Sequence, residues 1–209
     1  MATDERQRGW DERHSHGDFE GEGPNSTLQE GVAGLARGRA LELACGSGTN
    51  AVWLASQGFD VTAVDWSAVG LENGRAKARE AGVSVEWLQR NLFEWTPPER
   101  SFDLVAIVYL HLPPDERRPV YGGAAAAVAP GGRMLVVAHH PQNAVEGFGG
   151  PPAERMLTPE QISEGLLATD PTLEIERADV VRRADLDRPP IDSLVIVRRP
   201  MPDAASAPR

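Results

Sequence analysis

Residues 40–51 read ALELACGSGTNA, and this stretch decides the fold. An apolar run of strand length leads into a turn that holds Gly46 and Gly48, and a segment of helical period follows the turn. Glycines let the backbone turn sharply and let a ligand touch the main chain. The stretch therefore predicts a strand, a ligand-binding turn and a helix.

A carboxylate stands at the end of the next predicted strand. Asp65 lies 17 residues after Gly48, where a carboxylate can accept hydrogen bonds from ribose hydroxyls. The strand, the turn and this carboxylate together predict a nucleoside-binding βαβ unit. The glycine spacing also fits the dinucleotide fingerprint G-x-G-x-x-G/A, so the glycines alone leave an NAD-dependent oxidoreductase open.

Glu42 separates these two ligand classes. A carboxylate near the buried end of a parallel strand is costly to desolvate unless a cation pairs with it. A pyrophosphate would be repelled there, whereas S-adenosylmethionine carries an ammonium and a sulfonium and no phosphate. The structural alternative is an ion pair between Glu42 and an arginine such as Arg39 or Arg75. We expect the ligand role for Glu42.

The rest of the chain alternates apolar runs of strand length with segments of helical period. This alternation indicates an α/β fold, a Rossmann-like doubly wound sheet of seven strands that is mostly parallel. Strands are expected over residues 39–44, 60–64, 84–88, 102–108 and 133–138, and helices over 26–37, 49–57, 67–81, 114–128 and 158–168. After Pro171, two strand-like runs joined by ADLDRPP predict a C-terminal antiparallel hairpin.

The length and composition predict one compact soluble domain. The chain has 209 residues, 41% of them hydrophobic, and 31 acidic residues against 21 basic ones. The net charge of −10 argues against nucleic acid as a partner. The sequence has no apolar run of membrane-spanning length and no signal peptide, so we expect no membrane contact and a cytoplasmic location. The single cysteine, Cys45, agrees with a reducing compartment and is expected to be buried and inert.

The motifs, in their order along the chain, resemble those of the class I S-adenosylmethionine-dependent methyltransferases. LELACGSG resembles the first motif of that family, with Ala44 at the place of the usual first glycine. VTAVDWS resembles the second motif and QRNLFEW the third, while FDLVAIVYLHLPP and APGGRMLVVA resemble the fourth and fifth. The C-terminal hairpin is also a habit of the family. The resemblance implies methyl transfer from S-adenosyl-L-methionine to a small-molecule acceptor.

The resemblance also implies which residues hold the cofactor. Asp65 would hold the ribose hydroxyls and Glu42 would face the methionine ammonium. The residues expected at the adenine or along the main chain of the turn are Ala44, Gly46, Gly48, Asn50, Trp66, Asn91 and Leu92. The family often has Asp where Asn91 stands, and an asparagine can still accept a hydrogen bond from an amino group.

The N-terminal residues 1–24 have no apolar period and are expected to form a flexible arm or lid, with residues 25–199 as the methyltransferase domain and 200–209 as a disordered tail. A Trp-Asp-Glu-Arg segment there resembles the tellurite-resistance and thiopurine methyltransferase branch, which covers its cofactor with the N-terminal segment. Trp10 and Arg13 are therefore candidates for cofactor contact, and docking on the surface explains them equally well.

Three histidines are candidates for a general base: His139 and His140, which follow the fifth predicted strand, and His111 in YLHLPP. An oxygen or nitrogen acceptor would gain from such a base, whereas a thiolate, selenide or telluride would need none. A surface or structural role is the alternative for each of them. No metal-ligand spacing appears, so no metal is expected. The sequence gives no oligomeric state, and a non-catalytic module that binds the cofactor remains a rival.

Overall fold

The computed structural model describes residues 3–17, 23–146, 150–183 and 190–202. One sheet contains all seven strands in the order β3-β2-β1-β4-β5-β7-β6. The strands are β1 (Arg39–Leu43), β2 (Asp60–Asp65), β3 (Glu86–Gln89), β4 (Phe102–Val108), β5 (Val128–His139), β6 (Glu174–Arg182) and β7 (Ile191–Arg198). The first five strands are parallel, and β7 pairs antiparallel with both β5 and β6. The predicted fold class is confirmed.

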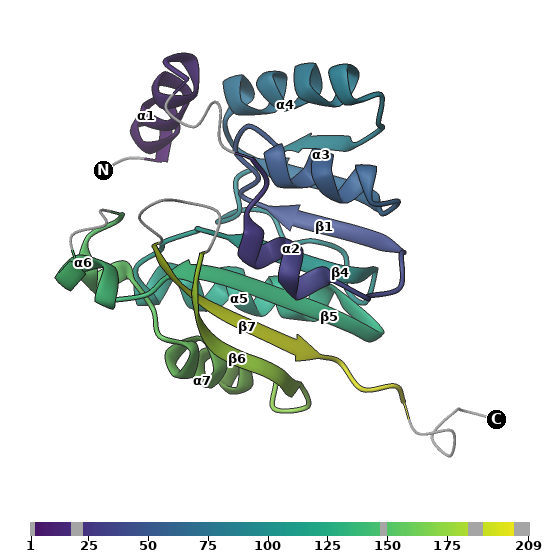
Figure 1. The fold of residues 1–209 in the computed structure, drawn as a ribbon, viewed down its shortest axis with the longest axis vertical. Helices are drawn as coiled ribbons and strands as arrows, with labels where there is room; N and C mark the ends of the chain where they lie inside the picture. Colours follow the sequence, from purple (N-terminus) through teal and green to yellow (C-terminus); the bar gives the residue numbers. More distant parts are fainter. Residues whose placement is uncertain (1–2, 18–22, 147–149, 184–189, 203–209) are drawn as a thin grey trace.

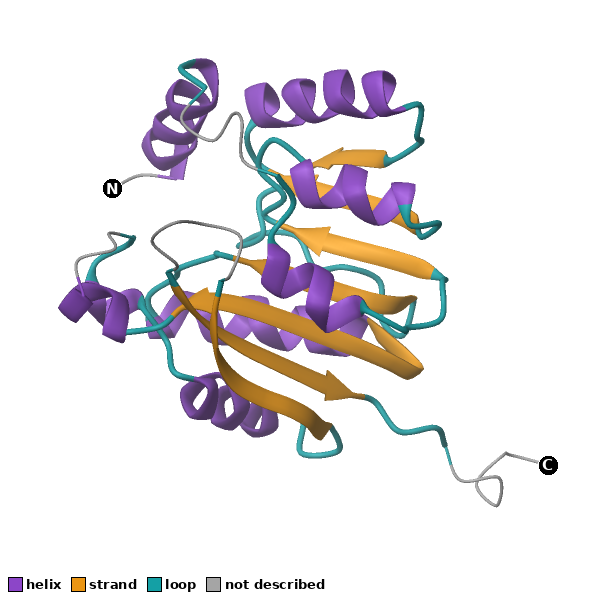
Figure 2. Ribbon diagram, in the orientation of Figure 1, coloured by secondary structure: helices purple, strands orange, loops and turns teal. Residues whose placement is uncertain are grey.

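Helices cover both faces of the sheet, as Figures 1 and 2 show. The helices are α1 (Thr3–Ser15), α2 (Ser26–Val32), α3 (Thr49–Ser56), α4 (Ala68–Ala81), α5 (Pro114–Ala127), α6 (Gln142–Glu146) and α7 (Pro159–Thr169), with a short 3-10 helix at Ala153–Arg155. Two buried apolar clusters lie on opposite faces of the sheet. One packs the sheet against α5 and α7, and the other packs it against α2, α3 and α4. Such double coverage explains the near-continuous apolar runs of the central strands.

Side-chain caps and glycines define several helix ends. The Ser67 hydroxyl accepts a hydrogen bond from the backbone N–H of Gly70 and so caps α4, which ends at Gly82 in the left-handed conformation. Thr158 forms a reciprocal capping box with Gln161 at the start of α7. The predicted helix over residues 26–37 is wrong at its end, because α2 stops at Val32.

Residues 3–15 of the expected N-terminal arm or lid form a helix, α1, which lies beside α4 (Figure 1). Helix α1 has no apolar stripe, and polar side chains hold it against the domain instead. Asp11 accepts hydrogen bonds from the Ser67 hydroxyl and the Val69 N–H, and the carbonyl of His14 accepts one from Asn73. Residues 18–22 of the expected arm and 203–209 of the expected tail lie outside the described residues.

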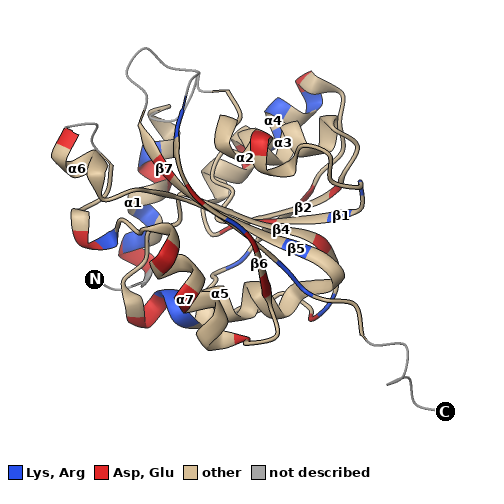
Figure 3. Cartoon of the chain, turned by 60° about the horizontal axis from the view of Figure 1, so that its bottom comes forward, with Lys and Arg blue, Asp and Glu red and all other residues tan. Residues whose placement is uncertain are grey.

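The edge strand β6 carries both acidic and basic side chains, which Figure 3 shows in red and blue. Arg177 pairs with Glu30 of α2 and with Asp179, and Arg133 of β5 forms a two-pronged ion pair with Glu176. Charges along an exposed edge disfavour pairing with a strand of another chain.

Ligands are expected at the carboxyl ends of the central strands. The strand order reverses there between β1 and β4 and leaves a crevice for ligands.

Candidate cofactor and acceptor site

The glycine turn between β1 and α3 has an unusual backbone. Ala44, Gly46 and Gly48 all have positive φ, at 55°, 54° and 68°. A positive φ costs an alanine about 1 kcal/mol, so Ala44 occupies a position that favours glycine. At Gly48 an added Cβ would lie 2.4 Å from the Trp87 ring, so this glycine is required by both its conformation and its packing. The turn thereby brings backbone close to the mouth of the crevice.

Glu42 is a buried carboxyl whose side-chain partner is Asn50. Its side chain is on a residue that is 1% exposed, and Oε1 accepts a hydrogen bond of 3.0 Å from Nδ2 of Asn50. Oε2 has no hydrogen-bond partner among the described residues. Burial raises the pKa of Glu42 to about 8. The ion pair with Arg39 or Arg75 that served as the structural alternative is not formed, because Arg75 pairs with Glu72 and Arg39 is exposed.

Asp65 joins the end of β2 to the glycine turn. Its Oδ2 accepts a hydrogen bond of 2.8 Å from the Gly46 N–H, and its Oδ1 accepts one of 2.8 Å from the Ser67 N–H. Burial raises the pKa of Asp65, while these N–H donors and the nearby His14 lower it. A carboxylate has about four acceptor positions, so Asp65 keeps capacity for further donors such as ribose hydroxyls.

Helix α1 lies over the turn and presents His14 to it. The residue is 6% exposed, and its ring would meet a Cβ added at Gly46 or at Gly70 within 3.2 Å. Trp10 and Arg13, the two candidates from the sequence, stack on one another with the guanidinium 5.0 Å from the ring centroid, and both are exposed. The polar face of α1 that contacts the domain instead holds Arg6, Gln7, Asp11 and His14.

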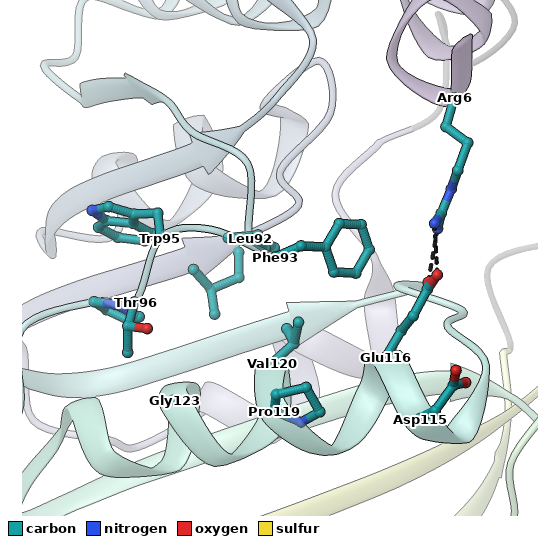
Figure 4. A pocket seen from close by; sticks show the side chains of 12 residues that line it. Arg6, Leu92, Phe93, Trp95, Thr96, Asp115, Glu116, Pro119, Val120 and Gly123 are labelled. Carbon is teal, nitrogen blue, oxygen red and sulfur yellow. Dashed lines mark hydrogen bonds and ion pairs between the residues drawn. The ribbon is translucent and has the colours of Figure 1, made fainter. Parts of the chain in front are cut away.

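The predicted adenine residues lie beside a cavity of about 440 Å³ between the loop after β3 and α5 (Figure 4). Leu92 and Phe93 line it from the loop, and Val120 lines it from α5. Trp66 contacts Phe93 edge to face at 6.0 Å, and the carbonyl oxygen of the Asn91 side chain accepts a hydrogen bond from the Phe93 N–H.

Arg6 of α1 reaches the same cavity. It forms a two-pronged ion pair with Glu116 of α5, at 2.8 and 3.0 Å, which Figure 4 shows. Its guanidinium also lies 5.0 Å from the Phe93 ring centroid and 5.7 Å from that of Trp66. Arg6 thus connects α1 to both walls of the cavity.

The candidate histidines separate into a pair and a single residue. Nδ1 of His139 lies 3.1 Å from Nε2 of His111, at the carboxyl ends of β5 and β4. Burial lowers the pKa of His139 to about 4 and that of His111 to about 3. His140 is more exposed, and its Nδ1 accepts a hydrogen bond from the Gln142 N–H.

Four contributors escaped the sequence interpretation. Arg6 and His14 were missed because no apolar period marks α1. Lys77, the only lysine of the chain, donates hydrogen bonds to the hydroxyls of Ser47 and Thr49 and so ties the glycine turn to α4. Asp192 joins the histidine pair only through the pairing of β7 with β5.

The described part of the chain has neither a metal-binding cluster nor a membrane-spanning helix. No group of three or more His, Cys, Asp and Glu side chains there is placed to hold a metal ion. No helix in that part has the length and apolar character needed to span a bilayer. Cys45 is buried, and burial raises its thiol pKa, as expected for an inert residue.

Part of the chain is similar in sequence to known methyltransferases. Residues 40–132 match the family model described as a methyltransferase domain. A ubiquinone biosynthesis O-methyltransferase of Klebsiella pneumoniae is 29% identical over 111 residues, which are 52% of this chain and 45% of that relative. The chain thus spans less than half the length of this curated relative.

Solved structures share the fold at low sequence identity. The N-methyltransferase NodS from Bradyrhizobium japonicum, solved with S-adenosyl-L-homocysteine, matches with a TM-score of 0.65 and 16% identity, over 90% of this chain and 86% of that one. The [4+2]-cyclase SpnF matches with a TM-score of 0.67 and 21% identity, over 84% and 80% of the two chains. The chain thus shares its fold with solved methyltransferases, and its residues 40–132 match the model of a methyltransferase domain.

Proposed function

We propose that this protein transfers a methyl group from S-adenosyl-L-methionine to a small molecule. The observation that carries the proposal is the buried Glu42 carboxyl, whose Oε2 has no partner among the described residues. A buried polar atom without a partner costs free energy of about 1–3 kcal/mol, so its retention calls for a role. An ammonium group is the complement of such an atom, and the cofactor's methionine moiety has one.

The other residues of the crevice fit the rest of the cofactor. Asp65 has free acceptor capacity for ribose hydroxyls. Leu92 and Phe93, which line the cavity, and Trp66, which packs on Phe93, fit an adenine ring, and the main chain of residues 44–48 fits the methionine moiety. When bound, the cofactor supplies a methyl group on a positively charged sulfur, a good leaving group. The protein's task is then to position the acceptor and to exclude water.

We place the acceptor at the carboxyl ends of β4 and β5, where His111 and His139 lie. The matched relative named as an O-methyltransferase and the fold neighbour named as an N-methyltransferase favour an oxygen or nitrogen acceptor. Sulfur, selenium and tellurium nucleophiles, the acceptors of the tellurite-resistance and thiopurine branch, form the alternative acceptor class.

Two rival functions make different predictions. An NAD-dependent oxidoreductase would have to place a pyrophosphate beside Glu42, which is unfavourable when the carboxyl is ionised. The second rival is a protein that binds the cofactor without transferring its methyl group, and the fold also occurs in a protein named for another reaction, a [4+2]-cyclase.

The test measures binding and turnover on the full chain. Calorimetric titration should give tighter binding of S-adenosylhomocysteine than of NADH, and NADH binding more tightly would overturn the proposal. Cofactor labelled in its methyl group is then incubated with phenols, amines, thiols and chalcogen anions. Binding without label transfer to any of them would favour the non-catalytic module.

A further inference from the structure

A buried polar cluster joins the ends of β4, β5 and β7 outside the proposed cofactor contacts. Tyr109 directly follows β4, and its N–H bonds to the carbonyl of Val137 in β5. Asp192 of β7 lies directly opposite His139 in the antiparallel register. Tyr109 stacks on His139 with ring centroids 4.2 Å apart, and His111 completes the cluster. Three strands thus converge on one imidazole.

The hydrogen bonds around His111 fix where the protons lie. Nε2 of His111 accepts a hydrogen bond of 3.3 Å from the backbone N–H of His139, so this nitrogen carries a lone pair. The same nitrogen lies 3.1 Å from Nδ1 of His139, and this contact needs a proton that only His139 can supply. His139 is therefore protonated at Nδ1, and its Nε2 is left with a free lone pair. A hydrogen bond from the His111 ring to the Tyr109 backbone agrees with a proton on the other nitrogen of His111.

Tyr109 and Asp192 hold the His139 ring in place. Tyr109 has φ of 59°, a conformation that costs a non-glycine residue of order 1–3 kcal/mol and persists only where surrounding contacts impose it. Its hydroxyl donates a hydrogen bond of 2.8 Å to Asp192, which is fully buried and also accepts one of 2.7 Å from Thr27. The strained backbone at Tyr109 and the two hydrogen bonds at Asp192 indicate that the surrounding contacts fix the position of the ring stack.

We propose that Nε2 of His139 accepts the proton of a neutral O–H or N–H methyl acceptor, with His111 as the positioning residue that fixes this tautomer. The inference rests on the proposed methyltransferase function and narrows its acceptor class. The acceptor's oxygen or nitrogen forms the bond to the methyl carbon as the carbon–sulfur bond breaks with its electron pair on sulfur. The acceptor's proton passes to His139 and then to water. A thiolate has no such proton and would not need this arrangement.

The charges around His139 define its pH behaviour. Burial and the neighbouring Arg183 lower its pKa to about 4, and Arg155 acts in the same direction on His111. Tyr109 and Asp192 face the ring from β4 and β7 and bond to each other. His139 is thus neutral from pH 6 upward, with its one ring proton on Nδ1, so transfer to a phenol by the native protein should depend little on pH between 6 and 9.

The first test reads the tautomer directly in the full-length protein with S-adenosylhomocysteine. Long-range proton–nitrogen NMR should find His139 protonated at Nδ1 and unprotonated at Nε2 between pH 6 and 8. His111→Gln keeps an acceptor oxygen and should preserve this tautomer, whereas His111→Phe removes the acceptor and should shift the proton to Nε2. A proton on Nε2 of His139 in the native protein would overturn the inference, whatever the variants do.

The second test uses catechol and thiophenol as acceptors at saturating cofactor. His139→Gln should lower kcat for catechol at pH 7 by 100-fold or more, with the deficit shrinking as the pH rises and catechol ionises. It should leave transfer to thiophenol and the affinity for S-adenosylhomocysteine unchanged, and exposed His16→Gln serves as the control. Equal catechol rates in native protein and His139→Gln would overturn the inference. If the native protein does not bind S-adenosylhomocysteine, the proposed function itself would be overturned.

Discussion

At the scale of single residues, the burial of the Glu42 carboxyl is the feature of the candidate site that the sequence predicted most directly. A carboxylate inside an apolar strand stands out in any sequence, and the structure adds its fully buried Oε2. The cluster of Tyr109 and Asp192 could not be predicted, because these residues are 83 positions apart. Their contact depends on the register of β7 against β5, which local patterns do not encode.

Glu42 should give the protein a distinctive pH dependence of stability. Its folded-state pKa of about 8 lies above the ordinary value of 4.5, so the stability from its protonated form is fully present below pH 4.5 and is lost as the pH rises toward 8. The slope is about 1.4 kcal/mol per pH unit inside this window. Glu42→Gln cannot ionise, so it escapes this loss. Its unfolding free energy relative to that of the native protein should therefore rise by this amount per pH unit.

Urea unfolding at pH 5, 6.5 and 8, without ligand, measures this difference. Other buried groups are present in both proteins, so their contributions largely cancel in the comparison. The exposed Glu72→Gln is the matched control and should follow the native curve. Parallel stability curves for Glu42→Gln and the native protein would contradict the assigned burial of Glu42.

At the scale of elements, the sequence predicted the strands and the helices that bury apolar faces, and it missed two helices that do not. Helix α1 docks through Arg6, Asp11 and His14, so no apolar period reveals it. Helix α6 has five residues, too few to give a period. The start of β5 at Val128, five residues before the predicted one, was hidden by Pro130 and the glycines after it.

The contact of α3, α4 and β3 depends on glycines under Trp87. A Cβ added at Gly74 would lie 2.6 Å from the Trp87 ring, whereas one at Gly122 in α5 would meet Thr169 at an ordinary 3.6 Å. Gly74→Ala should therefore lower the unfolding free energy by about 1–3 kcal/mol, through overpacking. Gly122→Ala, the matched control, should raise it by about 0.5–1 kcal/mol, as in an ordinary helix interior. Thermal and urea unfolding measure both, and a stabilised Gly74→Ala would refute the tight packing.

Helix α1 should act as a gate, because His14 and Arg6 lie where the cofactor is proposed to bind. The Arg6–Glu116 pair is partly exposed and is worth about 1 kcal/mol at most. Arg6→Gln should therefore speed association of S-adenosylhomocysteine by up to about fivefold. The exposed Arg8→Gln is the control. Stopped-flow fluorescence measures the rate, and an unchanged rate for Arg6→Gln would show that α1 does not limit entry.

At the scale of the whole molecule, the carboxyl edge of the sheet divides into two halves. The candidate cofactor residues follow β1, β2 and β3, and the histidine pair lies at β4, β5 and β7. The two halves meet where the strand order places the ends of β1 and β4 side by side. The acceptor itself lies beyond such reasoning, since side chains from distant segments shape its site.

The central claim is that the buried Glu42 carboxyl binds the ammonium of the cofactor. Isothermal titration of S-adenosylhomocysteine, which keeps that ammonium and lacks the sulfonium, tests it on native protein, Glu42→Gln and Glu72→Gln. We expect binding by Glu42→Gln to be at least tenfold weaker, about 1.4 kcal/mol, with Glu72→Gln unchanged. Binding by folded Glu42→Gln as tight as that of the native protein would contradict the claim.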